Sequence, residues 1–485
     1  MEHKFTKSDL QNILDNVMNK TLGEVDKNNV FSRTISNPKI TGIAGDVIEQ
    51  SVLEYPADTK QEPDLKVDDI DVELKTLGIR KSKKDEKLYE AKEPLTVTAV
   101  SPDKIVSEEF YTSNFWHKIE HLLLVFYLYD SDATVKASDY ANFLIKGYEF
   151  FEFSKEDQKI LENDWKIVRN FIKYLQDEYT DYESEYPRIS HELREKLLYI
   201  DTAPKWPNRP RFRIKRSVVS NIIQEYFGNH LEKLPDNYSS YADIENKCKE
   251  LTLKYSGMTI KELLLHLFSS YDFSTGVSKS IGEQLTVKMF GGSSKKISQI
   301  ELFSKLNILP KTIVVTEEGK RTEDMKLFPL DFEELSNPYV SFEESSFLEN
   351  FTNMQLMCIL FEEHDSNVFE SNTFLGFKRF MFSNDFIEST VRGIWNSIRE
   401  LILNNKLEDV VSYKNGTNIP IVNKNGVIKS APNFPKSKDS ILFVRGGGAD
   451  SSKKTEEVNG IKMYKQYLWL KGSYITEELS KNDYI

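Results

Sequence analysis

Four charged side chains in the first part of the chain have the types and spacing needed for metal-assisted hydrolysis. Glu49 is followed by Asp64, and these by Glu73 and Lys75. Hard divalent cations prefer carboxylate oxygens as ligands. A lysine beside such a site can orient an attacking water and offset charge on a phosphate. The pattern therefore predicts a metal-dependent site that acts on phosphodiesters.

A strand and a preceding hairpin must position these groups. Residues 70–75 alternate, so Ile70, Val72 and Leu74 are predicted to face the core and the intervening residues, including Glu73 and Lys75, the other side. Short patterns of this kind are frequent in a chain with 76 acidic and 64 basic residues, mostly on solvated strands. A helix-compatible segment at 42–54 and the dipeptide at 63–64 precede this strand, which favours the catalytic interpretation.

The remaining elements predict an α/β fold with helices on the faces of a mixed sheet. Further strands are expected at 95–100 and 122–129, the second apolar enough to be central, and an amphipathic helix at 164–174.

The chain also repeats itself once, at an offset of about half its length. Six pairs match in the same order: Thr21 with Thr259, Gly45 with Gly282, Lys75 with Lys311, Phe115 with Phe347, Trp165 with Trp395, and Lys215 with Lys471. At 485 residues the chain is long enough for two cores. We therefore predict two copies of one domain, at 1–230 and 246–485, joined by a linker at 231–245.

The first half resembles MutH-type endonucleases of the PD-(D/E)xK superfamily. The resemblance covers the segments 42–45, 63–64 and 72–76 together with Glu49, and it continues to Asp164-Trp165 and to 212–216. The doubled arrangement is similar to two-domain GATC-cutting type II restriction endonucleases, in which a degenerate MutH-like domain follows the catalytic one. Mismatch-repair MutH has a single domain, so the length favours a restriction enzyme.

The resemblance implies roles for individual residues. Asp64 and Glu73 would bind Mg²⁺, for which Mn²⁺ can substitute, Glu49 would support the metal, and Lys75 would act on the nucleophile. Asp64 precedes Glu73 by more positions than in mismatch-repair MutH, so Asp68 or Asp69 competes for its role. The lysine before the GxxG motif is Thr41 here, with Lys39 as a substitute.

The second half lacks the carboxylates of the first. Aligned on Lys311, the position of Glu73 is Leu309 and that of Glu49 is Thr286. We therefore expect this domain to bind DNA without cutting it. The resemblance places Arg445 where it would read a base edge of GATC, by contact to guanine. The glycine-rich loop around it is either ordered by DNA or a surface loop without a role.

Basic residues outside the catalytic pattern suggest contacts to the DNA backbone. Residues 205–216 hold six basic residues and no acidic one, among them Arg213, Lys215 and Arg216, and Lys471 is the second-half match of Lys215. A solvated basic surface is the alternative. The net charge of −12 counts against a simple electrostatic DNA binder, so local clusters of basic residues matter more than the total charge.

The sequence thus predicts a type II endonuclease that cuts double-stranded DNA, pairs with a second copy on DNA, leaves 5′-phosphates and works opposite a DNA methyltransferase. A strand-nicking repair enzyme and a non-catalytic sequence-specific DNA-binding protein are the alternatives. With no apolar run long enough for a membrane span and no secretion signal, a bacterial cytoplasmic location is expected.

Two other patterns could suggest metal or disulfide chemistry. Residues 117–121 fit the H-x-x-E-H pattern of inverted zinc peptidases, but they run into an apolar strand, so a surface histidine pair is expected. Cys248 and Cys358 lack the spacing of a zinc site or a disulfide framework and are expected to be ordinary thiols.

Overall fold

The chain folds into two compact units. The computed structural model describes residues 4–38, 40–55, 63–82, 86–131, 135–202, 210–274, 276–278, 280–321, 323–343, 345–365, 368–415, 417–423, 426–448 and 453–485. The first unit comprises Met1–Ser131, Val135–Glu245 and Phe290–Asn307, and the second Asp132–Thr134, Asn246–Met289 and Ile308–Ile485. Lys39, residues 203–209 of the basic stretch and residues 449–452 of the glycine-rich loop lie outside the described residues.

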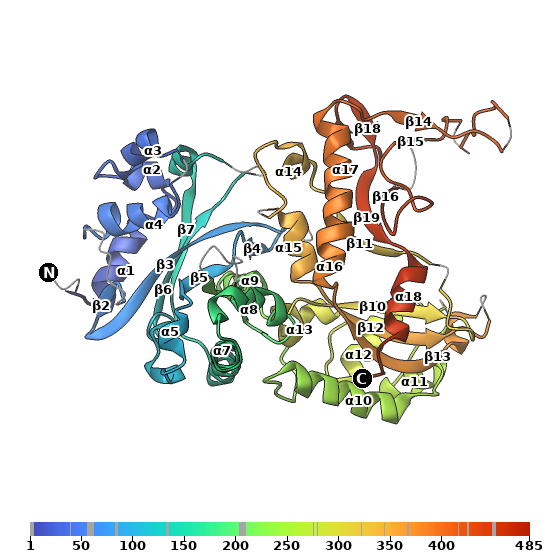
Figure 1. The fold of residues 1–485 in the computed structure, drawn as a ribbon, viewed down its shortest axis with the longest axis horizontal. Coiled ribbons are helices and arrows are strands. Elements are labelled where there is room, and N and C mark those ends of the chain that lie inside the picture. The colour runs from blue at the N-terminus through green and yellow to red at the C-terminus, as the bar shows by residue number, and fades with distance from the viewer. Residues whose placement is uncertain are drawn as a thin grey trace. The chain divides into compact units, whose positions relative to one another are not determined.

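The first unit is built on a mixed sheet whose centre is β6 (Leu122–Leu128). β3 (Ile70–Lys81) runs parallel to it and β7 (Leu144–Phe151) antiparallel, and the hairpin strand β2 (Leu65–Val67) extends the sheet beyond β3 (Figure 1). All residues of β6 but the last are buried. The predicted α/β class and the central strand are confirmed.

Helices surround this sheet. The bounds of the other first-unit elements are β1 (Lys4–Phe5), α1 (Lys7–Asp15), α2 (Leu22–Val25), α3 (Arg33–Ser36), α4 (Ile43–Val47), β4 (Tyr89–Ala91), β5 (Leu95–Ala99), α5 (Pro102–Ile105), α6 (Asn114–His117), α7 (Lys155–Glu178), α8 (Pro187–Glu192), β8 (Ile200–Asp201), β9 (Arg211–Ile214), α9 (Arg216–Tyr226) and α13 (Glu301–Lys305). Residues of α1, α2 and α4 form one core cluster with Leu74 and Leu123 of the sheet.

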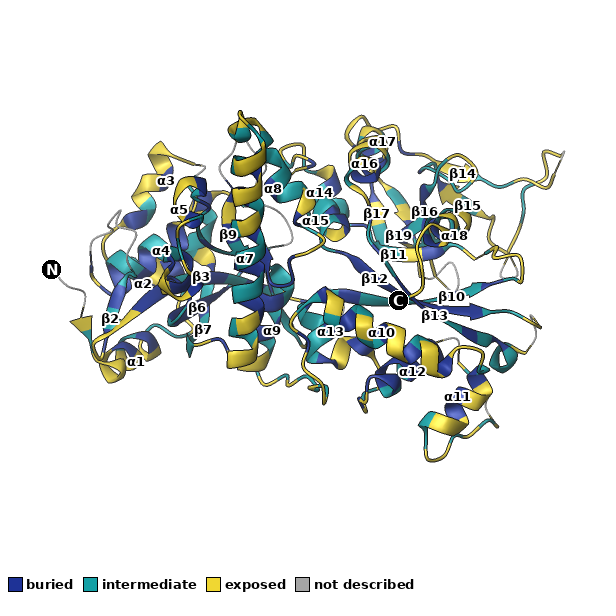
Figure 2. Cartoon of the chain, turned by 60° about the horizontal axis from the view of Figure 1, so that its bottom comes forward, coloured by how far each residue is buried: buried dark blue, intermediate teal, exposed yellow. Residues whose placement is uncertain are grey.

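The helix predicted at 164–174 is α7, which is longer at both ends. Ser154 caps it by accepting a hydrogen bond from the backbone N–H of Asp157. Ile160, Trp165 and Val168 recur at helical spacing on its buried side, and its exposed residues lie along the opposite side (Figure 2). The predicted helix was shorter than α7 because charged residues dominate the first and last turns of the helix, where the apolar pattern is weak.

The second unit repeats the strand order of the first. β10 (Ile308–Val315) is parallel to β12 (Gln355–Glu362), which is antiparallel to β13 (Thr373–Phe380), as in β3, β6 and β7. β19 (Lys465–Leu470) lies between β11 (Met325–Pro329) and β16 (Leu442–Gly447), as β9 lies between β5 and β8, and all four pairings are antiparallel.

The other second-unit elements include two additional short strand pairs. Their bounds are α10 (Tyr241–Tyr255, which begins in the first unit), α11 (Ile260–Leu267), α12 (Ile281–Met289), α14 (Phe332–Ser336), α15 (Ser346–Thr352), α16 (Asn384–Phe386), α17 (Arg392–Leu403), β14 (Asp409–Val411), β15 (Ser430–Pro432), β17 (Glu456–Val458), β18 (Ile461–Met463) and α18 (Gly472–Ser480). The pair β14–β15 has no counterpart at the matching place of the first unit, where α8 and β8 lie. Among the described residues no helix could cross a bilayer.

Local details at the matched positions are also duplicated. Thr21 and Thr259 each begin a helix with a capping box, completed by Glu24 and Glu262, and each forms an isolated bridge to the third strand of its own sheet. Trp165 and Trp395 are both buried. Such shared details support the interpretation that one domain was duplicated.

The matched glycines of the two units differ in how tightly they pack. A Cβ on Gly45 would lie 3.4 Å from Thr76 Oγ1, whereas a Cβ on Gly282 would overlap with Thr312 Oγ1. Threonine is β-branched, so its side chain cannot easily turn away. Gly282→Ala is therefore expected to lower the free energy of unfolding by about 1–3 kcal/mol relative to Gly45→Ala, measured by urea denaturation. Equal unfolding midpoints for the two variants would contradict this packing.

Candidate active site

The β2–β3 hairpin sets Asp64 across from Glu73. Leu65 pairs with Val72, so Asp64, the residue before β2, comes opposite Glu73, and its Oδ2 accepts a hydrogen bond of 3.0 Å from the backbone N–H of Leu74. Among the three candidate aspartates, Asp64 is thus the one beside Glu73.

Asp68 and Asp69 form the turn of the hairpin instead. Both have positive φ, 48° and 67°, and both are exposed. Ile70, predicted to face the core, is 49% exposed because it follows this turn directly, so that prediction is wrong for the first strand residue. Val72 and Leu74 are buried as expected.

Glu73 is the most constrained charge of the site. It is 1% exposed, and its carboxylate accepts hydrogen bonds from two lysines. Lys75 Nζ lies 2.6 Å from Oε1, and Lys118 Nζ lies 3.0 Å from Oε1 and 2.9 Å from Oε2. A buried carboxylate is stable only with such partners. These contacts fix the orientation of the Glu73 carboxylate.

Lys118 was not identified from the sequence. It lies between α6 and β6, and because β6 runs parallel to β3, this segment ends beside Glu73, whose N–H donates to His121 O at 3.0 Å. A lysine four residues before the first residue of a strongly apolar strand is a usable signal, since it is carried toward the interior and needs an anionic partner.

Glu49 lies on a π-helical turn, Ile48–Val52, that continues α4. The predicted single helix at 42–54 therefore widens where Glu49 sits, as π-turns often do at functional sites. Glu49 is partly buried, and burial raises its pKa to about 7, with Asp64 and Glu73 among the neighbouring carboxylates that raise it further. Burial and then Glu73 raise the pKa of Asp64 to about 6, against the effect of Lys75 and Lys118.

The three carboxylates therefore share one electrostatic environment in which they repel one another. All donors are oxygens, which suits a hard dication such as Mg²⁺ better than zinc. The described His, Cys, Asp and Glu side chains form no group of three already spaced to hold a metal ion. Lys75 and Lys118 balance the charge of Glu73 in this structure, and a bound dication would relieve the repulsion at Asp64 and Glu49.

The matched positions of the second unit cannot form such a site. Leu309 stands where Glu73 stands in the first unit, and Thr286 is buried with its hydroxyl donating to Gly282 O at 2.9 Å. Lys311 Nζ donates to the backbone oxygen of Lys326 at 2.8 Å. Counting from the Phe115–Phe347 match, Asn350 takes the place of Lys118 and is exposed.

The basic residues of β9 and α9 have partners within the first unit. Arg213 forms two ion-pair contacts with Asp201, at 2.7 and 3.0 Å. Arg216 donates to a backbone oxygen at 2.8 Å and to Glu90 at 3.0 Å, and Lys215 donates to a backbone oxygen. These contacts tie the strand and helix to their neighbours, and a DNA-contacting role for the three residues stays a prediction. The sequence pattern did not reveal these ion pairs, because the acidic partners Asp201 and Glu90 lie outside the basic stretch.

Arg445 and Lys471 lie at the β16–β19 end of the second unit. Arg445 is on β16, with its side chain 46% exposed and Nη2 2.8 Å from Asp324 Oδ2. Its guanidinium also lies 4.8 Å from the ring centre of Trp469. Lys471 precedes α18. Asp324 holds Arg445 in place, and base reading by Arg445 stays a prediction.

The local structure argues against a zinc site at residues 117–121 and against a disulfide between the two cysteines. α6 ends at His117, and His121 Nδ1 lies 2.9 Å from Glu152 Oε1, so one helix does not hold both histidines of the H-x-x-E-H pattern. Cys248 and Cys358 are buried free thiols, as expected.

Comparison with known proteins gives two matches. Residues 53–164 match the family model of the DNA mismatch repair enzyme MutH. The chain is also 25% identical, over 532 aligned positions covering 99% of each protein, to the type II restriction enzyme Sau3AI of Staphylococcus aureus. The MutH match contains Asp64, Glu73, Lys75 and Lys118, and the second match extends through both units.

Lys118 is expected to act as a positioning residue for Glu73. Lys118→Met removes the hydrogen bonds that orient Glu73 and a cation that lowers the pKa of Asp64, so DNA cleavage should fall about 10- to 100-fold and its pH profile should move to higher pH. Lys118→Arg should recover part of the activity. Lys173→Met, on the exposed side of α7, is the matched control. An unchanged pH profile in Lys118→Met would exclude this role.

The raised pKa values of Asp64 and Glu49 predict a pH-dependent response to metal. Because the folded-state pKa values lie above the ordinary ones, their contribution to stability is present at low pH and is lost as the pH rises through about 6 to 7. Mg²⁺ needs the deprotonated carboxylates, so its stabilising effect should grow over the same range. Melting temperatures with and without Mg²⁺ at about pH 5 and about pH 8 measure this. An equal Mg²⁺ effect at both pH values would contradict the assignment.

Proposed function

We propose that this chain, a MutH-like restriction endonuclease, uses Mg²⁺ to hydrolyse both strands of double-stranded DNA at GATC sites, leaving 5′-phosphates. The observation that supports this best is the contrast between its two units. The first holds Glu73 between Lys75 and Lys118 and beside Asp64, whereas the second has the same strand order with Leu309 at the Glu73 position.

The side chains of the first unit divide the chemistry among them. Asp64, Glu73 and Glu49 would hold Mg²⁺, which when bound polarises the scissile phosphate and stabilises the leaving oxygen. Lys75, the more exposed of the two lysines on Glu73, orients the attacking water and offsets charge on the phosphate. Lys118 holds the Glu73 carboxylate in position through two hydrogen-bond contacts. Mn²⁺ would bind the same oxygens.

The second unit would bind DNA without cutting it. Arg445 would read guanine of the GATC site by a bidentate contact, after exchanging Asp324 for the base. The GATC preference itself follows from the likeness to two-domain GATC-cutting enzymes. One set of catalytic carboxylates per chain requires two chains on a palindrome, or one that acts twice, so we propose pairing on DNA. A DNA methyltransferase would protect the host, in the bacterial cytoplasm.

Strand nicking is the second candidate, because one chain carries one set of carboxylates. Supercoiled plasmid distinguishes the two, since a restriction enzyme gives linear product and a nicking enzyme an open circle. Plasmid from methylating and non-methylating hosts also tests the dependence on methylation.

The two matched lysines provide an internal control for the cleavage test. Lys75→Ala should reduce Mg²⁺-dependent linearisation of GATC plasmid at least about 100-fold, because Lys75 lies at Glu73 and the nucleophile. Lys311→Ala, at the same position of the second unit, should cleave like the wild type. Cleavage without divalent cation, or equal loss in the two variants, would reject the proposal of one metal-dependent site in the first unit.

A further inference from the structure

The second unit carries a β-arm that the first unit lacks. We define it as residues 409–432, in which β14 pairs with β15 and isolated bridges join Tyr413 to Pro420 and Val422 to Ile428. It extends out from the second unit beyond β14 and β15 (Figure 1). No such arm is found among the described residues of the first unit, so the arm is not part of the core that the two units share.

Exposed apolar side chains concentrate on the β-arm. Six of the 17 large apolar side chains that are exposed among the described residues lie between 410 and 428: Val410, Tyr413, Ile419, Val422, Val427 and Ile428. Exposed residues dominate this segment of the chain (Figure 2). Contiguous exposed apolar surface usually marks a binding surface.

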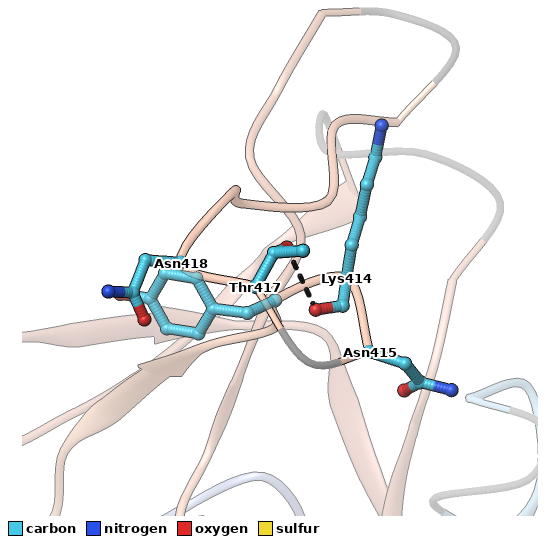
Figure 3. Close-up of a pocket in the computed structure, with 5 residues that line it drawn as sticks. Lys414, Asn415, Thr417 and Asn418 are labelled. Atoms are coloured by element: carbon cyan, nitrogen blue, oxygen red, sulfur yellow. Dashed lines mark hydrogen bonds between the residues drawn. The ribbon is translucent and has the colours of Figure 1, made fainter.

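The charge of the β-arm indicates the kind of partner. Residues 409–432 contain three lysines, Lys414, Lys424 and Lys429, and one acidic residue, Asp409, in a chain whose net charge is −12. The outer part forms a hollow lined by Tyr413, Lys414, Asn415, Thr417 and Asn418, where Thr417 donates to Lys414 O at 3.0 Å (Figure 3). Amide, hydroxyl and ammonium groups are those that contact phosphate and sugar oxygens in DNA complexes.

A second hollow, of about 310 Å³, lies where the base of the β-arm meets β16. Four cations line it, Lys429, Lys436, Arg445 and Lys454, together with Phe443 and Tyr464, and no acidic side chain is among its described lining residues. Lys454 donates to Ser430 Oγ at 3.5 Å and Lys436 donates to a backbone oxygen. Asp324 forms an ion pair with Arg445, and the carboxylate of Asp409 acts electrostatically on Lys436. The four cations outnumber these two carboxylates, which favours an anionic ligand, and Arg445 connects this hollow to the proposed base-reading site.

We propose that the β-arm and the hollow at its base bind the sugar–phosphate backbone of the DNA duplex whose GATC bases Arg445 contacts. This inference rests on the proposed function and assigns the place at which the second unit holds its DNA. The lysines neutralise phosphates, and the apolar side chains of the arm pack against the sugars at the edge of the groove. A basic surface with interleaved apolar groups fits a nucleic acid better than an apolar protein face.

The test compares the salt dependence of DNA affinity. In a Glu73→Gln background, which keeps the duplex uncut, fluorescence anisotropy measures binding to a labelled duplex with one GATC site over a range of salt concentrations. Lys429→Ala/Lys454→Ala should weaken binding about tenfold or more and reduce the slope of log affinity against log salt by about 2. Ile419→Asp/Val422→Asp should also weaken binding. Lys481→Ala, on a surface lysine of α18's C-terminal end, should change neither quantity beyond the effect of one distant charge.

Each outcome decides one claim. If both double variants bind DNA with the affinity and salt slope of the parent protein, and the enzyme that retains Glu73 still cleaves DNA, the β-arm assignment is overturned and the proposed function stands. Absence of any DNA binding or cleavage by the wild type would instead overturn the proposed function. If Ile419→Asp/Val422→Asp changes sedimentation of the free protein but not DNA affinity, the arm is an interface between copies, and the DNA assignment is wrong.

Discussion

The arrangement of the first unit depends on one buried carboxylate. Glu73 is nearly inaccessible, and its carboxylate accepts hydrogen bonds from both Lys75 and Lys118, so removing one of them would leave a single cation to compensate it. That requirement fixes three elements: β3, which carries Glu73 and Lys75, the segment before β6, which carries Lys118, and the hairpin that brings Asp64 opposite. Burial, and after it the repulsion among Asp64, Glu49 and Glu73, raises the pKa values of the first two. The three carboxylates would hold a dication, and Lys75 would orient the attacking water.

The second unit shows that the fold does not need this charge cluster. With Leu309 at the Glu73 position and Lys311 bound to a backbone oxygen, the β10–β12–β13 sheet keeps the order and pairing of β3–β6–β7. The Asp64, Glu73 and Glu49 carboxylates are therefore not required for the architecture of the sheet. The two units share their strand pairing, but only the first has the carboxylates. The fold of this domain can therefore be kept without the residues proposed for its chemistry.

The sequence predicted the features that depend on local pattern. Alternation located β3, apolar continuity located β6, and the six matched pairs anticipated a repeated topology that includes both threonine capping boxes. It failed where partners are distant in sequence. Lys118 reaches Glu73 only through the parallel pairing of β3 and β6, and Arg213 and Arg216 meet acids supplied by other strands. The membership of Phe290–Asn307 in the first unit also depends on long-range contacts, such as Lys305 with Asp157, that no local pattern encodes.

The central claim, that the first unit alone holds the catalytic metal, is tested most directly by electron paramagnetic resonance of bound Mn²⁺. The protein would be bound to a duplex with a non-hydrolysable linkage at its GATC site. The account predicts that Asp64→Asn and Glu73→Gln each remove the signal of tightly bound Mn²⁺, whereas Lys311→Ala leaves it unchanged. A bound-Mn²⁺ signal that survives in both Asp64→Asn and Glu73→Gln would contradict it.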